Sequence, residues 1–186
     1  IMSEQGLAVT TLGAVAAAAG CSVHSLYATF GGRDGLLAAI YENYSPIVDI
    51  EKIVAQPPRN VADTVKDIYR ALAAGLTQEP RVAPAMLAEV FSRRDGAAGR
   101  VFQRYFPRVL DSVGAWLSAE VHAGRIRPLP MPLLIQQLIG PLAVHLLLRP
   151  VLTCGPGSDL PSVEEACVVF ADAFVRAVTV SQETTG

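Results

Sequence analysis

The sequence has little charge and no large surplus of either sign. Only 17% of its 186 residues are charged, and 15 basic against 17 acidic side chains give a formal net charge of −2. The whole chain therefore has no electrostatic attraction to nucleic acid. Because 51% of the residues are hydrophobic, disorder is excluded, and the length suits one compact domain or a small domain joined to a larger one.

Cysteine is scarce, and the catalytic constellations are missing. Cys21, Cys154 and Cys167 have no metal-ligand spacing, and their odd number argues against a disulfide framework. We expect reduced thiols, with Cys21 as a small core residue. The scattered histidines suggest no Ser-His-Asp or Cys-His pairing, and no glycine-rich phosphate loop follows a strand. The sequence thus predicts no enzyme, no cofactor and no metal.

One long segment lacks charge altogether. From Pro128 to Leu148 no side chain is fully charged, and the length would nearly span a bilayer. The segment also contains prolines, glutamines and His145, and polar groups are costly inside hydrocarbon. We therefore expect a helix buried between subunits and not a membrane-spanning helix. The first residues lack the pattern of a signal peptide, which predicts a cytoplasmic protein.

Long alternating runs of apolar and polar residues are also lacking. Apolar residues recur three and four apart along nearly the whole chain, which predicts an all-α fold. Thr10 is expected to cap a helix over 11–18, Ser22 a helix ending at Phe30, and Asn60 a later helix. Pro107 should bend a long helix that ends near residue 123. The last helices are expected over 132–148 and 162–180.

The stretch around Gly20 has the pattern of a helix-turn-helix. Two short helices meet at this glycine, Ala16 is small enough for their crossing, and Val15, Cys21 and Leu26 supply the apolar side chains beneath. In this motif the second helix lies in the DNA major groove.

The same stretch resembles the N-terminal signature of the TetR family of transcriptional regulators. The similar positions lie within residues 1 to about 45. They are Gly6, Thr10-Thr11, Val15-Ala16, Ala19-Gly20-Cys21-Ser22, Leu26-Tyr27, Phe30, Arg33-Asp34 and Leu36-Leu37. The resemblance implies a helix-turn-helix domain over 1–45, with an incomplete first helix, and an all-helical ligand-binding and dimerisation domain over 46–186. It also implies a homodimeric repressor that binds a palindromic double-stranded DNA operator and is released by a small apolar or amphipathic effector.

The resemblance also implies which residues contact DNA. Ser22 and Ser25 match groove and phosphate contacts, and Tyr27 matches the phosphate-binding tyrosine, although it could instead pack on the three-helix core. Thr11 and Arg33 match phosphate clamps. Sequence preference should then depend on the side chains that face the bases, which are Val23, His24, Ser25 and Thr29. His24 could equally be plain solvent-exposed surface. Val23 and His24 replace a frequent lysine and glycine, so the module is poor in positive charge.

Outside this module the sequence leaves alternatives open. The candidate effector site comprises Met86, Phe91, Phe102, Phe106, Trp116, Gln137 and His145. The large side chains could equally fill an ordinary core, and Gln137 and His145 could bond each other or backbone across a subunit interface. Arg100, Arg104 and Arg108 form either a solvated helix face or an extension of the DNA surface.

The two most apolar helices predict the dimer interface. Its expected residues are Leu138, Leu142, Phe170, Phe174 and Ala177, with Phe174 at the centre. A second functional hypothesis is a dimeric helical protein that binds a small molecule or a partner helix and does not touch DNA. The low positive charge of residues 1–45 favours that alternative.

Overall fold

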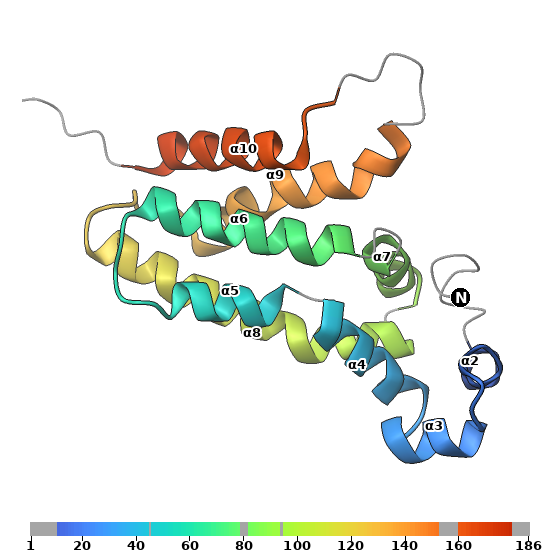
Figure 1. Cartoon of the computed structure of the whole chain (residues 1–186). Coiled ribbons are helices and arrows are strands. Elements are labelled where there is room, and N and C mark those ends of the chain that lie inside the picture. The colour runs from blue at the N-terminus through green and yellow to red at the C-terminus, as the bar shows by residue number, and fades with distance from the viewer. Residues whose placement is uncertain (1–10, 45, 79–81, 94, 153–159, 180–186) are drawn as a thin grey trace, which may run out of the picture. The chain divides into compact units, whose positions relative to one another are not determined.

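The computed structural model describes residues 11–44, 46–78, 82–93, 95–152 and 160–179, and this part of the chain is almost entirely helical (Figure 1). The helices are α2 Leu12–Ala19, α3 Val23–Phe30, α4 Arg33–Tyr44, α5 Ile47–Val54, α6 Val61–Gln78, α7 Val82–Ser92, α8 Ala97–His122, α9 Met131–Leu152 and α10 Val163–Val178. The β-structure in the described residues is one isolated antiparallel bridge between Ile126 and Thr179. The predicted all-α class is confirmed.

The chain divides into two compact units. The first joins residues 1–45 to residues 75–107, and the second joins residues 46–74 to residues 108–186. The chain passes from one unit to the other at Pro46, Gly75 and Pro107-Arg108. These units are not the two continuous segments expected from the sequence, because residues 75–107 join the first unit.

In the first unit, α2 ends in a left-handed glycine turn. Gly20 has φ 66°, and the N–H groups of Gly20 and Cys21 donate to the carbonyls of Ala17 and Ala16 at 3.4 and 3.0 Å. This is the hydrogen-bond pattern of a Schellman C-cap. The Cys21 side chain is exposed, so its predicted place in the core is wrong. The residue closes the turn through its backbone, which leaves its thiol pointing to solvent.

The start of α2 also differs slightly from the prediction. The hydroxyl of Thr11, and not that of Thr10, caps the helix by accepting from the Ala14 N–H at 3.1 Å. Ala16 and Leu26 are buried, as expected for the crossing of α2 and α3. Gly31 and Gly32 then take positive φ angles of 69° and 123°, and α4 begins at Arg33. The predicted double-glycine stop is confirmed.

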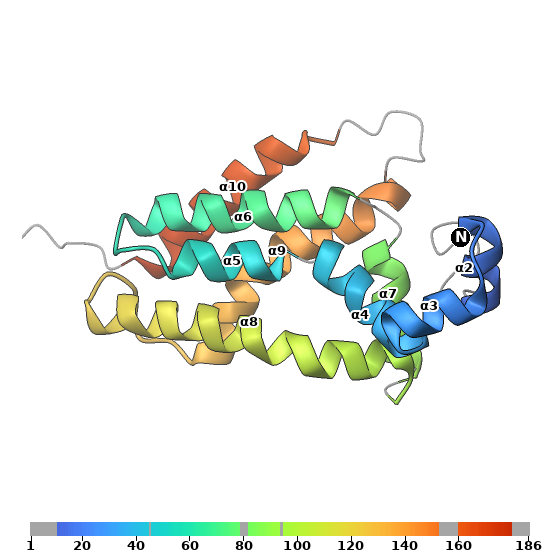
Figure 2. The same ribbon diagram turned by 60° about the horizontal axis from the view of Figure 1, so that its bottom comes forward.

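The second unit contains a helix that the sequence did not suggest. α5 lies between Pro46 and Pro57-Pro58, beside the first part of α6 (Figures 1 and 2), and buries Ile47 and Ile50. The start of α6 agrees with expectation, because Asn60 Oδ1 accepts from the Ala62 N–H at 2.8 Å. The apolar residues of α6 in this unit are buried in one stripe, Val61, Val65, Ile68 and Leu72.

The last two helices pack side by side within the chain (Figures 1 and 2). On α9 the buried residues recur every four positions, at Leu134, Leu138, Leu142 and Leu146. The stretch Met131–Arg149 is long and apolar enough to cross a membrane, with 22% of it buried. A buried stripe of this kind is also what the core helix of a soluble bundle requires.

This packing corrects the predicted dimer interface. Leu138 and Leu142 are fully buried and Phe174 is only 3% exposed in the single chain, so these side chains belong to its own core and cannot meet a partner. Phe170 and Ala177 are half-buried. Other apolar side chains of the two helices are exposed, namely Leu133, Val144, Leu148, Val151 and Leu152 of α9 and Val168 and Val169 of α10.

Candidate DNA-binding surface and ligand cavities

The helices α2 and α3 have the geometry of a helix-turn-helix. The chain turns by 110° between them, within the range of about 90–120° that characterises this motif. Ser22 fixes the start of α3, because its Oγ accepts from the Ser25 N–H at 3.0 Å and lies 2.9 Å from Ser25 Oγ. The Thr29 hydroxyl donates to the Ser25 carbonyl at 2.9 Å. The polar side chains of α3 are therefore held in defined positions.

The residues predicted to contact DNA lie mostly on the surface. Those exposed are Thr11, Ser22, Val23, His24, Ser25, Tyr27 and Thr29, and Arg33 is half-buried. Tyr27 is 60% exposed, and one edge of its ring lies close to the backbone of Gly32, where an added Cβ would be 3.6 Å from the ring. Its phenol is therefore not a core group, in contrast to the alternative left open by the sequence.

The start of α4 is tied to α8 by an ion pair. Arg100 donates to the two carboxylate oxygens of Asp34 at 2.7 and 3.1 Å. The hydrogen bonds from Arg100 lower the pKa of Asp34, partial desolvation opposes them, and the charges of Arg100 and Arg33 lower it further. In the same unit the buried Tyr105 donates to the Glu42 carboxylate. Two contacts thus hold α4 against the first part of α8.

Each of the three arginines spaced four apart on α8 has a neighbour of its own. Arg100 pairs with Asp34, and Arg108 pairs with Glu51 of the second unit at 3.0 Å. The guanidinium of Arg104 lies over the Tyr105 ring, 5.6 Å from its centre. All three side chains lie at the surface, which agrees with the solvated helix face that the sequence left open, and two of them also pair with carboxylates.

The predicted effector residues fall in both units. In the first, Phe91 is 82% exposed, and Phe102 stacks on Phe106 with ring centres 4.4 Å apart. The side chain of Met86 lies outside the described residues. In the second unit lie Trp116, Gln137 and His145.

His145 contacts Phe170 of α10 and Arg149 of α9. Its ring lies edge-on to Phe170 at 5.8 Å, and its Nε2 lies 3.2 Å from Arg149 Nη1. Partial burial, assisted by the Arg149 charge, lowers the pKa of His145. Gln137 is exposed. Within the described residues, the two side chains therefore do not bond each other.

The second unit contains two neighbouring hollows. One, of about 430 Å³, lies between the α5–α6 segment and the second part of α8, and Trp116 lines it. The other, of about 710 Å³, lies where α6 begins and where α8 and α10 end. Both are lined by Pro58, Arg59 and Arg125. Of the predicted effector residues, Trp116 is the one that lines either hollow.

Arg59 was not among the predicted binding residues. Its position in the sequence could have indicated a binding role, because Arg59 directly precedes the cap of α6, where the helix dipole disfavours a positive charge. Arg125 was likewise not among the predicted binding residues. Among the described residues, no cluster of His, Cys, Asp and Glu is suited to a metal ion.

The first 40 residues match a known family of regulatory domains. Residues 1–40 match the family described as "Bacterial regulatory proteins, tetR family", and the described part of this segment has the helix-turn-helix geometry given above. The chain therefore carries an N-terminal domain of the TetR family, and this domain together with the fold supports a DNA-binding transcriptional regulator. No curated protein matches its sequence.

Solved structures with the same fold extend over nearly the whole regulator. PfmR, a TetR family transcriptional regulator from Thermus thermophilus, is 20% identical with a TM-score of 0.69, covering 94% of this chain and 92% of its own. A TetR family transcription regulator from Marinobacter aquaeolei is 20% identical with a TM-score of 0.69, covering 96% and 89%. The flavonoid-responsive regulator FrrA is 19% identical with a TM-score of 0.60, covering 97% and 92%. At these identities the likeness establishes the fold alone.

Proposed function

We propose that this regulator is a cytoplasmic homodimeric repressor that binds a palindromic operator and is released by a small-molecule effector. The observation that carries the DNA-binding part is the exposed set of residues on α2 and α3, with Tyr27 60% exposed and Ser22 capping the helix. These side chains lie where a recognition helix in the major groove would present them. No catalytic step is part of this function.

The exposed side chains of this surface fall into two groups, those that contact phosphates and those that contact base edges. Thr11, Ser22, Tyr27 and Arg33 bind phosphates. Val23, His24, Ser25 and Thr29 face the base edges. Hydrogen bonds from Ser25 or His24 to bases would each contribute about 1–3 kcal/mol of discrimination against a wrong base.

Dimerisation uses the exposed apolar side chains of α9 and α10. Val144 is 53% exposed and Val169 is 59% exposed, and a monomer would leave these valines and their apolar neighbours in water. Burying such a patch against a second copy is favourable. A two-fold axis also presents two copies of α3 to half-sites that are about 34 Å apart, or a multiple of that distance.

The effector binds in the helical region outside the helix-turn-helix. FrrA is named as responsive to flavonoids, which supports small-molecule control on this fold. The hollow lined by Trp116 is of a suitable size, since ligand pockets commonly measure about 300–1,000 Å³.

A second function has one observation in its favour. Between residues 11 and 44, Arg33 is the one lysine or arginine, whereas two residues, Asp34 and Glu42, are acidic. A helical dimer that binds small molecules without touching DNA would need no positive charge there.

Titration of DNA with the full chain separates the two functions. The probe is the DNA upstream of the regulator's own coding sequence, with a shuffled sequence of the same composition as control, measured by fluorescence anisotropy from about 50 to 200 mM salt. We expect preferential binding whose log affinity falls linearly with log salt. Equal affinity for both DNAs, or no binding at the lowest salt concentration, would favour the second function.

A further inference from the structure

The two hollows of the second unit share a wall that is rich in guanidinium groups. Arg59 comes from the segment before α6 and Arg125 from the segment after α8, and both side chains line both hollows. Residues far apart in the sequence thus bring two cations to one place. Their carboxylate partners determine what else these cations can bind.

The acidic groups of this wall already have partners. Glu120 has a side chain only 4% exposed, and Arg125 donates to its two oxygens from Nε at 2.5 Å and from Nη2 at 3.0 Å. Glu51 pairs with Arg108 at 3.0 Å. Neither acid therefore attracts a cationic ligand strongly.

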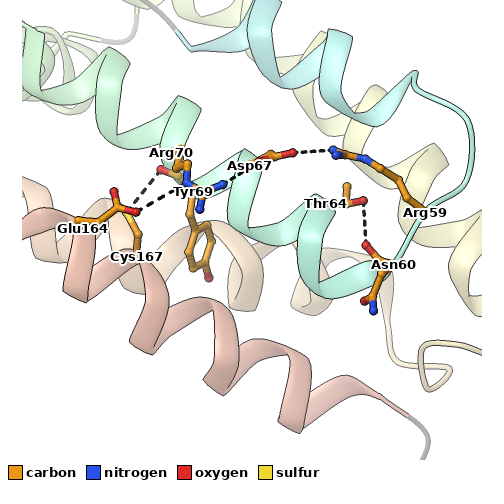
Figure 3. Close-up of polar contacts among 8 residues, drawn as sticks. All are labelled: Arg59, Asn60, Thr64, Asp67, Tyr69, Arg70, Glu164 and Cys167. Atoms are coloured by element: carbon orange, nitrogen blue, oxygen red, sulfur yellow. Dashed lines mark hydrogen bonds and ion pairs between the residues drawn. The ribbon is translucent and has the colours of Figure 1, made fainter.

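The guanidinium groups retain unused donors. Figure 3 shows Arg59 reaching toward Asp67, and the two form an ion pair of 2.8 Å through Nη2. The same carboxylate accepts from Arg70 at 2.9 Å. Nε and Nη2 of Arg59 are nevertheless buried and donate no hydrogen bond of good geometry within the described residues. Arg125 uses Nε and Nη2 on Glu120, and its side chain is 44% exposed, so Nη1 is open to solvent or to a ligand. A buried charged donor without an acceptor is costly, so a ligand acceptor placed here gains the corresponding free energy.

The smaller hollow is otherwise mainly apolar. Ile53, Val54, Pro57 and Trp116 line it, together with the uncharged polar residues Gln56 and Ser112. The Thr64 hydroxyl, which also lines it, already donates to the Asn60 carbonyl at 3.2 Å (Figure 3). Its volume of about 430 Å³ accommodates a small organic molecule and not only an inorganic ion.

We propose that this hollow binds an amphipathic monocarboxylate. The carboxylate accepts from Arg59 Nε and Arg125 Nη1, and the apolar part packs against Trp116, Val54 and Pro57. A planar carboxylate suits guanidinium donors, and the start of α6 beside them favours negative charge. The paired acids Glu51 and Glu120 in the same wall disfavour a multiply charged anion. The identification of this ligand as the effector rests on the proposed function, whereas its binding does not.

The chain offers a built-in reporter for this site. Trp116 is the single tryptophan of the sequence, so intrinsic emission reports on this hollow. Octanoate and 4-phenylbutanoate are titrated into the full-length protein, with octanamide and 4-phenylbutanamide as uncharged counterparts of equal size. We expect saturable emission changes with at least one carboxylate, and at least tenfold weaker binding of its amide. No saturable change with either acid, or equal affinity for acid and amide, would overturn the proposal.

Variants then test the assigned residues. Arg59→Gln removes the guanidinium, and Arg59→Lys retains the charge without Nε; both should weaken carboxylate binding about tenfold. Lys52→Gln is the matched control, since Lys52 is an exposed cation of α5 that pairs with Asp49 and lines neither hollow. Equal affinity in the Arg59 variants and the control would overturn the proposal.

A variant that fills the smaller hollow with a larger side chain tests the proposal even if the Arg59 variants do not fold. Ala119 lines the smaller hollow, and Ala119→Phe should abolish binding without removing any donor, whereas unchanged binding would contradict the assignment. DNA titrations of the unaltered protein, with and without carboxylate, separate the hypothesis of this binding site from the hypothesis that its ligand is the effector. Carboxylate binding that leaves operator affinity unchanged would count against the effector role alone, and operator binding without carboxylate binding would count against this site alone.

Discussion

At the scale of single residues, Tyr27 is the clearest test of the DNA-binding surface. Its side chain is 60% exposed, which leaves the hydroxyl accessible to a phosphate. We expect Tyr27→Phe to weaken operator binding about tenfold, since a hydrogen bond to a charged group contributes about 1.5–3 kcal/mol. Anisotropy titrations measure the affinity, and thermal unfolding shows whether the fold is intact. Unchanged affinity at every salt concentration would refute the assigned role.

Tyr69 presents the opposite situation, a tyrosine wholly buried in the second unit. Its hydroxyl has no hydrogen-bond partner within the described residues, and Figure 3 shows the ring extending from α6. Burial, with a smaller contribution from the Cys167 thiol, raises its pKa. Because an unsatisfied hydroxyl costs free energy, Tyr69→Phe should increase the free energy of unfolding by about 1 kcal/mol.

The same residue predicts a dependence of stability on pH. The unfolded tyrosine ionises near its ordinary pKa of 10.0, whereas the buried phenol keeps its proton to higher pH. The native chain therefore loses stability as the pH rises above about 10, and Tyr69→Phe lacks this part of the loss. Urea unfolding of both proteins at about pH 8 and pH 11, on either side of the ordinary pKa, measures the difference. A variant clearly less stable at the lower pH would mean that the hydroxyl has a partner.

At the scale of elements, the turn between α3 and α4 depends on a glycine inside a helix. A Cβ added at Gly35 would lie 1.6 Å from the carbonyl oxygen of Phe30, and backbone cannot yield as a flexible side chain would. We expect Gly35→Ala to lower the stability of the first unit by about 3 kcal/mol.

Gly13 supplies the matched control for that substitution. It lies in α2, where an added Cβ would meet its nearest neighbour, Thr11 Oγ1, at an ordinary 3.8 Å. Because alanine favours a helix over glycine, Gly13→Ala should stabilise the chain by about 0.5–1 kcal/mol. Thermal unfolding of the two variants measures both effects. Equal midpoints would show that Phe30 and Gly35 are not in close contact.

At the scale of the whole molecule, burial separates core residues from candidate dimer residues. Val144→Glu and Val169→Glu place a charge on the exposed apolar surface of α9 and α10, and should dissociate the dimer without unfolding the chain. Val48→Glu is the control, because Val48 is an exposed valine of α5. Phe174→Arg should instead unfold the protein, since an arginine cannot be accommodated in that core.

Sedimentation velocity at micromolar concentration, together with circular dichroism, measures these outcomes. Folded monomers for the α9 and α10 variants, and dimers for the control, are the expected result. If both glutamate variants remain dimeric, or if the unaltered protein is monomeric, the assigned surface is wrong. DNA affinity should fall with dissociation, because a monomer contacts only one half-site.

The sequence by itself determined the parts of this protein that depend on local chemistry. The double-glycine stop, the Ser22 cap and the Asn60 cap each involve residues only a few positions apart, so their hydrogen bonds could be predicted. The helix-turn-helix followed from such signals, and with it the resemblance of residues 1–45 to the TetR family. α5 was missed because a helix of eight residues between prolines gives too short a periodic pattern to recognise.

Only the tertiary structure decided which apolar faces are covered and which distant residues meet. α9 is apolar on all sides, so periodicity could not show that Leu138 faces inward while Val144 remains exposed. Cys21 faces solvent for a similar reason, because the Gly20 turn sets its direction. Arg59 and Arg125 are far apart in the sequence, and no local rule places them on one wall. Their meeting depends on packing between helices, which sequence spacing alone does not encode.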